Sequence, residues 1–459
     1  MNEKTFKNKM FSFLKMFKKG SIGTKLSFFI MGSGNIYHKQ YIKGFIFLIF
    51  QILFNLFMFL SIKVNNTPLG FKALKNLLTL GSNQGNIFEN ADDSRLMLLF
   101  GLITIAVIIF YNVIYIYNIK SSYKSDLLVL KGKKPPTFYE DIKSLLDERF
   151  YILLLIPSSI LVIIFTILPT IFMILIAFTD FGDPSSNTVE YFFNWVGFKN
   201  FKQIFMLTGQ LSRFPSILIW TFIWAFLATF SCYFGGILLA LLINKKGIKF
   251  KKMWRTIFIL TIAVPQFVSL LSVRNILGTY GPFNQLLINF NIIEKPIEFL
   301  GNVSIDKAYI AKISIIVINF WIGVPYTMLM TSGILLNIPK DLYEAATIDG
   351  ANKTKMFRKI TFPYILFVTG PYLISSFVGN ITSFNIIYLL TGGNPSYGDM
   401  SKAGATDLLV TWLYKLTIDE GIYNIGSIIS IMTFLITASI TLIAYRNSKS
   451  YKQEDTFQW

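Results

Sequence analysis

The sequence predicts an all-α polytopic membrane protein with eight transmembrane helices, and three observations support this fold class. Hydrophobic residues make up 53% of the 459 residues and charged residues only 15%, against about 25% charged residues in soluble domains. Eight stretches are each long and apolar enough to cross the roughly 30 Å of hydrocarbon in a bilayer. Basic residues gather in alternate connections, as they do in multi-pass membrane proteins.

The expected spans contain no Asp, Glu or His, and their few basic residues, among them Lys43, Arg274 and Lys312, lie near span ends, where long side chains reach the interface. Pro and Gly interrupt the later spans, and broken helices are tolerated at membrane depth where they pack in protein or line a cavity. This pattern favours a transport pathway over a plain anchor. The expected spans cover residues 41–62, 96–118, 150–178, 216–243, 254–278, 310–336, 364–390 and 424–445.

The charge distribution predicts the orientation. The net charge is +19, and 29 of the 43 Lys and Arg residues fall in the two terminal segments and every second connection. Loops rich in Lys and Arg stay on the cytoplasmic side, so both termini should be cytoplasmic. Membrane topology in a lipid bilayer therefore accounts for the basic composition without binding to nucleic acid. Residues 8–19 mix bulky apolar and basic side chains, which suits either an interfacial helix or a plain basic tail.

The chain is expected to divide near residue 145. Residues 1–145 hold a cytoplasmic N-terminal segment and two spans, and a basic stretch with Pro135 and Pro136 joins them to six further spans in residues 146–459. A proton- or sodium-coupled transporter usually keeps carboxylates or His in its spans, and the sequence has no G-x-x-x-x-G-K-[ST] phosphate loop. These features suggest a subunit driven by another protein, with a passive channel as the alternative.

One cytoplasmic loop, residues 337–363, predicts a short helix. Asp341 is followed three residues later by Glu344, which is a helix-start signature of the capping-box kind. Gly350 suits the left-handed residue that ends a helix. A short helix with small residues at its tip can dock into a cleft of another protein, although an interfacial helix would have a similar sequence.

The motif in this loop resembles the EAA loop of permease subunits of bacterial ABC importers. The resemblance rests on Glu344-Ala345-Ala346, on Asp349-Gly350-Ala351, and on Phe357, Ile360 and Pro363. In that family the loop is the coupling helix that docks into the ATPase, which implies ATPase coupling for Glu344, Ala345, Ala346, Asp349 and Gly350.

The eight spans, two of them additional at the N-terminus, resemble the larger (MalF-type) permease subunit of the maltose/maltodextrin transporter. The match is best over residues 215–445, and it includes Phe384–Pro395 and Ala405–Val410. The resemblance implies a type I ABC importer core of six spans in a bacterial plasma membrane. It also implies a second permease, two ATPase subunits that bind ATP-Mg, an extracellular sugar-binding protein, and no catalytic residue, metal or cofactor in this chain.

The resemblance further implies a sugar pocket half way across the membrane. Asn and Ser offer hydrogen-bond donors and acceptors to sugar hydroxyls, and Tyr adds an aromatic face. Small polar residues on membrane helices also mediate helix packing, which is the competing interpretation. The matching positions are Asn319, Ile322, Gly323 and Tyr326 in one span and Ser376, Gly379, Asn380 and Ser383 in the next.

Three functions therefore remain open. The favoured one is import of maltose or maltodextrin by alternating access, with ATP hydrolysed by the partner subunits. The second keeps the family and changes the substrate to another oligosaccharide or a polyol. An anionic substrate is disfavoured because neither pocket segment contains Lys or Arg. The third is a stand-alone secondary transporter or channel.

Overall fold

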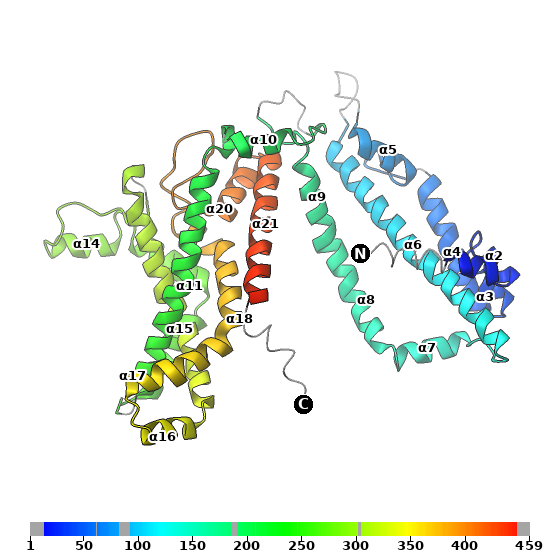
Figure 1. The fold of residues 1–459 in the computed structure, drawn as a ribbon. Helices are drawn as coiled ribbons and strands as arrows, with labels where there is room; N and C mark the ends of the chain where they lie inside the picture. The colour runs from blue at the N-terminus through cyan, green and yellow to red at the C-terminus, as the bar shows by residue number, and fades with distance from the viewer. Residues whose placement is uncertain are drawn as a thin grey trace. The chain divides into compact units, whose positions relative to one another are not determined.

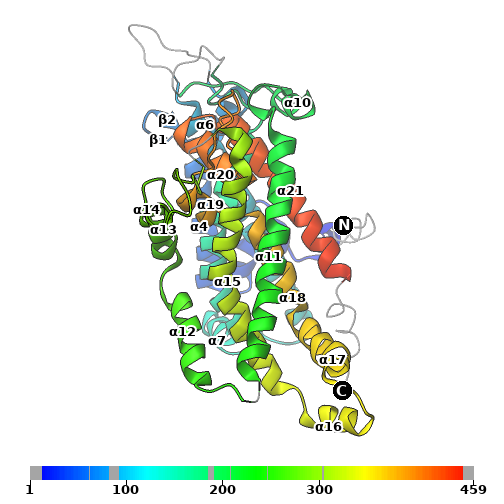
Figure 2. The same ribbon diagram turned by 90° about the vertical axis from the view of Figure 1, so that its left-hand side faces the viewer.

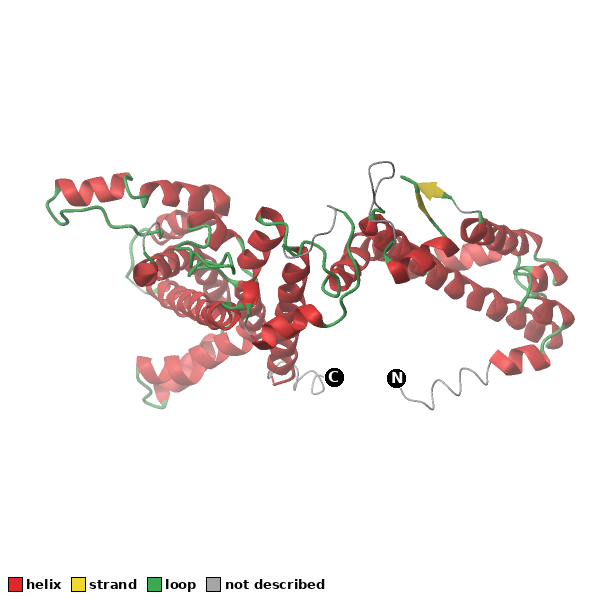
Figure 3. Ribbon diagram, turned by 90° about the horizontal axis from the view of Figure 1, so that it is seen from above, coloured by secondary structure: helices red, strands yellow, loops and turns green. Residues whose placement is uncertain are grey.

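The computed structural model of the chain is built almost entirely from helices (Figure 3). It divides into two compact units, Met1–Gly197 and Phe198–Trp459, each described here by itself. This division follows the contacts within each unit, so the boundary predicted near residue 145 from the basic, proline-containing stretch stays a prediction. The structure describes residues 13–60, 62–81, 92–184, 191–206, 208–245, 247–301 and 304–447.

The first unit contains long membrane helices and short amphipathic ones (Figure 1). Asp93 begins the longest helix, because its carboxylate accepts hydrogen bonds from the backbone N–H groups of Arg95 and Leu96. Thr137 and Glu140 form a reciprocal capping box at another helix start. The elements are α2 (Ile22–Leu26), α3 (Ser33–Tyr37), α4 (Tyr41–Phe59), β1 (Lys63–Val64), β2 (Thr67–Pro68), α5 (Phe71–Thr79), α6 (Ser94–Leu130), α7 (Phe138–Leu146), α8 (Phe150–Val162), a π-helical turn (Ile163–Ile167) and α9 (Leu168–Ile176).

The second unit packs its helices around α11 and α15, which run side by side (Figure 2). Its elements are α10 (Lys199–Met206), α11 (Phe214–Asn244), α12 (Lys251–Ala263), α13 (Gln266–Ile276), α14 (Pro282–Asn289), α15 (Ala308–Asn337), α16 (Lys340–Ile348), α17 (Lys353–Met356), a π-helical turn (Phe357–Thr361), α18 (Phe362–Ile381), α19 (Asn385–Leu390), α20 (Leu409–Tyr414), a π-helical turn (Lys415–Asp419) and α21 (Tyr423–Asn447), with short 3-10 turns at Gly209–Leu211 and Ile305–Lys307.

The membrane spans agree with the predicted fold class. Within the described residues, seven helical runs are long and apolar enough to cross a membrane, and a bent pair of helices makes up to eight. The bent pair is α12 and α13, which meet at 92°. Pro265 explains the bend, because proline disfavours helical backbone at the preceding residue, and Val264 is extended with ψ 127°. The fifth predicted span is therefore two short helices.

The seventh predicted span also differs in detail. A continuous helix was expected to residue 390, but α18 ends at Ile381 and α19 starts at Asn385. The Thr382 hydroxyl donates back to the carbonyls of Val378 and Gly379 at 3.4 and 3.3 Å. Such local side-chain bonds compete with helix continuation and account for the break.

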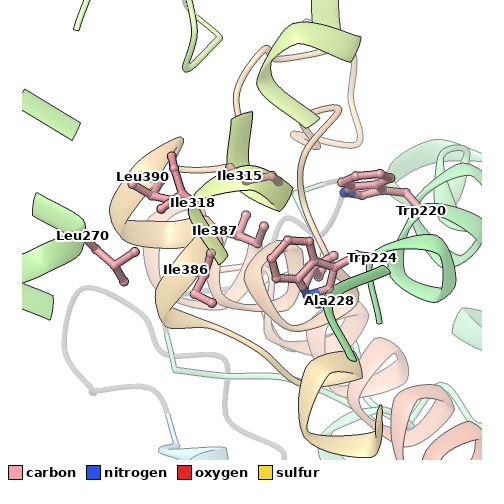
Figure 4. Close-up of a cluster of buried hydrophobic side chains, with 10 residues drawn as sticks. Trp220, Trp224, Ala228, Leu270, Ile315, Ile318, Ile386, Ile387 and Leu390 are labelled. Carbon is pink, nitrogen blue, oxygen red and sulfur yellow. The ribbon is translucent and has the colours of Figure 1, made fainter. Parts of the chain in front are cut away.

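The main core of the second unit lies where α11, α13, α15 and α19 meet (Figure 4). Trp224 is fully buried, and its ring stands beside Ala228 and near the isoleucines of α19. Lipid tails are as apolar as these side chains, so close van der Waals packing holds the helices together here. This core fixes α15 against α11, which bears on the predicted pocket. The cluster comprises Trp220, Trp224, Ala228, Leu270, Ile315, Ile318, Ile386, Ile387, Leu390 and Leu408.

Candidate functional site

The short helix α16 lies at one end of the second unit, opposite the end that carries α10 and α20 (Figures 1 and 2). It starts at Lys340 with Pro339 at the cap position, and no side chain caps it. The predicted capping role of Asp341 is therefore wrong. Proline suits a helix start because its missing N–H would be unpaired there. Asp341 instead sits in the first turn, where its charge complements the helix dipole.

The tip of α16 is open to a partner. Glu344, Ala345 and Asp349 are exposed and Ala346 is half-buried. Gly350 ends the helix with φ +72°, as its sequence position predicted, and a Cβ placed there meets no described atom within 4 Å. Ile348 is 87% exposed. An apolar side chain beside small residues on such a tip suits insertion into a cleft.

The loop is tied to the following membrane helix by one hydrogen bond and an aromatic contact. The Tyr343 hydroxyl of α16 and the buried Thr361 hydroxyl share a hydrogen bond of 2.9 Å. Thr361 ends the π-helical turn that leads into α18, and the rings of Phe357 and Phe362 pack 5.8 Å apart across this turn. A displacement of α16 therefore acts on the start of α18.

Within the membrane, the first predicted pocket segment lies against α11. Asn319 is 7% exposed, and its Nδ2 donates to the Cys232 sulfur at 3.5 Å. A Cβ on Gly323 would come within 2.6 Å of that same sulfur. Gly323 was predicted to belong to the sugar pocket, and the structure places the Cys232 side chain in the space beside it. Gly323 thus permits close approach of α15 and α11.

Tyr326 and Gly379 face open space instead. Tyr326 is 53% exposed, and its ring lies 5.8 Å from that of Tyr372 on α18. Gly379, seven residues after Tyr372, is exposed, and a Cβ there would meet no described atom within 4 Å. Sequence reasoning missed Tyr372, although its spacing of four residues from Ser376 placed it on the same helix face.

Asn380 connects α18 to α11. Its Nδ2 donates to the Thr229 hydroxyl at 2.9 Å, which leaves the side-chain carbonyl available as an acceptor. Ser376 and Ser383 are half-buried on α18. Ile322 is half-buried and packs against the tryptophan and isoleucine core. The eight predicted positions therefore divide between a helix seam and an open face formed by α15 and α18.

A buried ion pair at the far end of the unit was not foreseen. Asp407 is fully buried and accepts hydrogen bonds from Lys415 Nζ at 2.7 Å, from the Gly404 N–H at 2.7 Å and from the Thr411 hydroxyl at 2.9 Å. Burial raises the pKa of Asp407, and the contact with Lys415 opposes the rise. The only sequence signal was one acidic residue within a largely apolar stretch.

This network fixes the loop between α19 and α20. The hydroxyls of Thr391 and Thr406 share a hydrogen bond of 2.8 Å, and the Trp220 indole of α11 donates to the Thr406 carbonyl at 3.2 Å. At the surface, Arg213 Nε donates to Asp399 at 2.6 Å. Partial burial raises the pKa of Asp399, but hydrogen bonds from Ser401 and Arg213 outweigh it and hold that pKa below its usual value.

In the part of the chain that the structure describes, no group of three or more His, Cys, Asp or Glu residues is arranged to hold a metal ion. The free thiol of Cys232 is buried in the seam between α11 and α15. The geometry therefore provides an exposed tip on α16 and a hydrogen-bonded link from α16 to the start of α18. It also provides a face of α15 and α18 that carries neutral polar and aromatic side chains.

Comparison with known proteins gives a consistent result. The family profile "Binding-protein-dependent transport system inner membrane component" matches residues 233–452. The maltodextrin transport system permease protein MalC of Streptococcus pneumoniae is 37% identical over 434 residues, covering 93% of this chain and 95% of that protein. The galactooligosaccharides transport system permease protein GanP of Bacillus subtilis is 33% identical and covers 93% of this chain and 97% of its own length.

A solved structure shares the fold. One chain of a bacterial alginate ABC transporter, crystallised in complex with alginate pentasaccharide-bound periplasmic protein, superposes with a TM-score of 0.53. It covers 67% of this chain and 96% of its own, at 22% sequence identity. The resemblance inferred from the EAA loop is thereby confirmed at the level of family and fold.

Proposed function

The chain belongs to the inner membrane components of binding-protein-dependent transport systems, and from this premise we propose that it is the larger permease subunit of an ATP-driven maltodextrin importer. The observation that carries the proposal is its similarity, along nearly the whole chain, to a permease named for maltodextrin transport. Permeases of this family are transport subunits that work with an ATPase and a binding protein, so the function of this chain is movement of substrate across the membrane.

Coupling to the ATPase is assigned to α16. Glu344, Ala345, Ala346, Asp349 and Gly350 form or border its exposed tip, which suits entry into a cleft on the ATPase surface. Closure of the ATPase dimer on ATP would draw the tip inward. The Tyr343–Thr361 hydrogen bond and the π-helical turn would then pass this displacement to α18.

The sugar site is assigned to the face formed by α15 and α18. Tyr326 offers an exposed aromatic ring, Gly379 leaves room beside it, and Ser376 and Ser383 lie half-buried on α18. Asn380 keeps a free acceptor while Thr229 holds its amide nitrogen. Aromatic rings and neutral hydrogen-bonding groups suit a neutral oligosaccharide.

The other three predicted positions act on the seam in this proposal. Asn319 and Gly323 hold α15 against α11, and Ile322 anchors the same helix in the core. Rotation of α15 about this seam during alternating access would bring Asn319 to the sugar. The eight positions would thus contribute to sugar binding in different states of the transport cycle.

The assembly we propose contains a second permease, two ATPase subunits and an extracellular sugar-binding protein. ATP-Mg is bound by the ATPase subunits, and this chain contributes neither an ATP site nor a cofactor.

Both termini lie in the cytoplasm of a bacterial cell, as the excess of Lys and Arg in the terminal segments and alternate connections supports. On this orientation α16 is cytoplasmic and the loop held by Asp407 is extracellular.

The test is ATPase activity of the reconstituted complex with and without its binding protein, across a panel led by maltose and maltotriose. We expect stimulation by maltodextrins, and its loss in Tyr326→Ala and Asn380→Ala. Stimulation by a different sugar alone would retain the family and overturn the maltodextrin assignment. Equal stimulation in the pocket variants would remove the site assignment.

Similarity to a galactooligosaccharide permease supports one alternative substrate. Gly379 and Ser383 favour it, because both are small residues on the face formed by α15 and α18. Smaller side chains leave a wider face that accepts other glycosidic linkages. Galactobiose and galactotriose therefore belong in the same panel, and a larger response to them than to maltotriose would select this alternative.

A further inference from the structure

Residues 20–40 form a hairpin packed in the groove between α4 and α6, which the predicted cytoplasmic location of this segment did not anticipate (Figure 1). Both ends of the hairpin, which form its base, contact the carboxylate of Asp126. The Ser21 N–H donates to Asp126 Oδ2 at 2.8 Å, and His38 Nε2 lies 2.5 Å from Asp126 Oδ1. Asp126 is 5% exposed, so it closes the base in a nearly water-free setting.

The tip of the hairpin reaches the cytoplasmic end of the second predicted span and the middle of the first. The Phe28 carbonyl accepts a hydrogen bond from the Tyr115 hydroxyl at 2.7 Å. Tyr115 precedes Asp126 by eleven residues, which corresponds to about 16 Å along α6. Gln51, which also holds the tip, lies ten residues into α4, or about 15 Å from its start. Both residues fall inside the predicted membrane spans.

Side chains of the two spans satisfy the non-helical backbone of the tip. Gln51 donates to the Phe29 carbonyl at 2.9 Å and accepts from the Met31 N–H at 2.8 Å. Asn118 accepts from the Gly32 N–H at 2.9 Å and donates to the Ser27 carbonyl at 3.2 Å. Irregular backbone is tolerated at membrane depth only when its polar groups are paired in this way. This requirement accounts for the amide side chains of Gln51 and Asn118 in two largely apolar spans.

Glycines set the depth of the hairpin. A Cβ on Gly34 would lie 1.8 Å from the Ser122 hydroxyl oxygen. Gly32 has φ +85°, and a Cβ there would lie 2.0 Å from the Gly44 carbonyl oxygen of α4. The backbone of the hairpin therefore packs directly against α4 and α6, as small residues allow between membrane helices.

The outer side of the hairpin is apolar at the tip and basic toward the base. Leu26, Phe29 and Ile30 are 47%, 71% and 50% exposed. They continue the exposed apolar surfaces of the neighbouring spans, where Ile49 of α4 is 54% and Val113 of α6 is 60% exposed. The exposed basic residues of the segment and of the helical stretch before it are Lys15, Lys18, Lys19, Lys25 and Lys39.

We propose that residues 20–40 are a re-entrant hairpin seated in the cytoplasmic leaflet, with Leu26, Phe29 and Ile30 among the acyl chains and the lysines against anionic headgroups. Charge complementarity selects anionic lipid, because Lys side chains near such a surface are attracted to its negative charge. The leaflet assignment rests on the orientation given under the proposed function. Contact with lipid itself rests on the depth of Gln51 and on the exposure of Leu26, Phe29 and Ile30.

The test is lipid exposure of single cysteines labelled with an environment-sensitive fluorophore in the complete reconstituted complex. Phe29→Cys and Ile30→Cys probe the tip, and Lys39→Cys, on the same hairpin, is the matched control at the base. The parent chain gives the labelling blank, because its one cysteine, Cys232, is buried. Quenchers attached to lipid acyl chains are compared with aqueous iodide.

We expect acyl-chain quenchers to reduce the signal at positions 29 and 30 severalfold more than at position 39, and iodide to show the reverse order. Anionic vesicles should reduce iodide quenching at position 39 relative to neutral vesicles. Iodide quenching at position 29 equal to that at 39 would overturn the proposal, and so would shielding of position 29 from both quenchers, which indicates a protein neighbour.

Iodide added to only one side of sealed vesicles shows, in a separate measurement, which leaflet holds the hairpin. The assay needs neither sugar nor ATP, so a failed substrate assignment leaves its outcome unaffected. Gly34→Ala provides a second variant, because the added methyl group collides with Ser122 and should expel the tip. A label at position 29 in that variant should become open to iodide, whereas an unchanged response would contradict the packing on which the hairpin depends.

Discussion

The hydroxyl groups of Tyr343 and Thr361 lie 2.9 Å apart and join the exposed helix α16 to the start of α18. The two residues belong to a loop helix and to a π-helical turn, and π-helical turns inside helices are frequent at functional sites. Since α18 carries Ser376, Gly379 and Asn380, this pair connects the exposed tip of α16 to a helix of the proposed sugar site.

Tyr343→Phe should lower sugar transport per ATP hydrolysed, because it removes the hydroxyl and keeps the ring. A hydrogen bond contributes about 1 kcal/mol net, so the expected loss of coupling is roughly fivefold. The measurement is the ratio of sugar uptake to ATP hydrolysis in proteoliposomes. Tyr364→Phe, which alters a half-buried tyrosine three residues after Thr361, is the matched control.

Thr361→Val removes the other hydroxyl with little change in shape. If the two hydroxyls act only through each other, the double variant should show the same loss as either single one. Additive losses would contradict direct coupling.

Replacing Gly350 should weaken ATPase docking. A residue with a Cβ at φ +72° is strained by about 1 kcal/mol, and the side chain also fills the open tip. Gly350→Val should reduce co-purification of the ATPase and abolish uptake, while the two permeases still assemble. Gly333→Ala, at a helical glycine with equally open surroundings, should have little effect. Normal uptake by Gly350→Val would refute the docking assignment.

The two pocket glycines should respond differently to an added methyl group. Gly323→Ala brings a Cβ within 2.6 Å of the Cys232 sulfur, and such overpacking costs about 1–3 kcal/mol. Thermal unfolding of the purified complex should show this loss, and Cys232→Ala in the same chain should largely reverse it. Gly379→Ala should leave the unfolding temperature unchanged and shift the preferred sugar length. Equal destabilisation by both substitutions would contradict the division between seam and open face.

Breaking the buried ion pair should destabilise the second unit. Asp407→Asn leaves the Lys415 ammonium, whose side chain is 17% exposed, without its counterion. Loss of one partner of a buried pair costs about 3–5 kcal/mol. Lys415→Met in the same chain should recover most of the stability. The exposed pair Lys402–Glu420, tested by Glu420→Gln, should change stability by less than about 1 kcal/mol. A similar loss for both pairs would show that burial does not govern the effect.

The sequence predicted the spans, apart from the breaks in the fifth and seventh, together with the exposed loop helix α16 and the left-handed Gly350, because hydrophobic length and glycine chemistry are local properties. It could not give the direction in which Asn319 and Gly323 point, since ligand contact and helix packing favour the same small and polar residues. The pairs of Cys232 with Gly323 and of Asp126 with His38 join residues far apart in the chain. A single sequence contains no signal for such contacts, so the seam and the N-terminal hairpin emerged only from the structure.

Uptake of radiolabelled maltotriose into proteoliposomes that contain the complete complex tests the central proposal most directly. With binding protein and sugar on the side opposite α16 and ATP on the side of α16, the account predicts ATP-dependent accumulation above the external concentration. A nonhydrolysable ATP analogue should abolish it. Equilibration of maltotriose by this chain alone without ATP, or ATP-driven uptake that excludes every maltodextrin, would contradict the account.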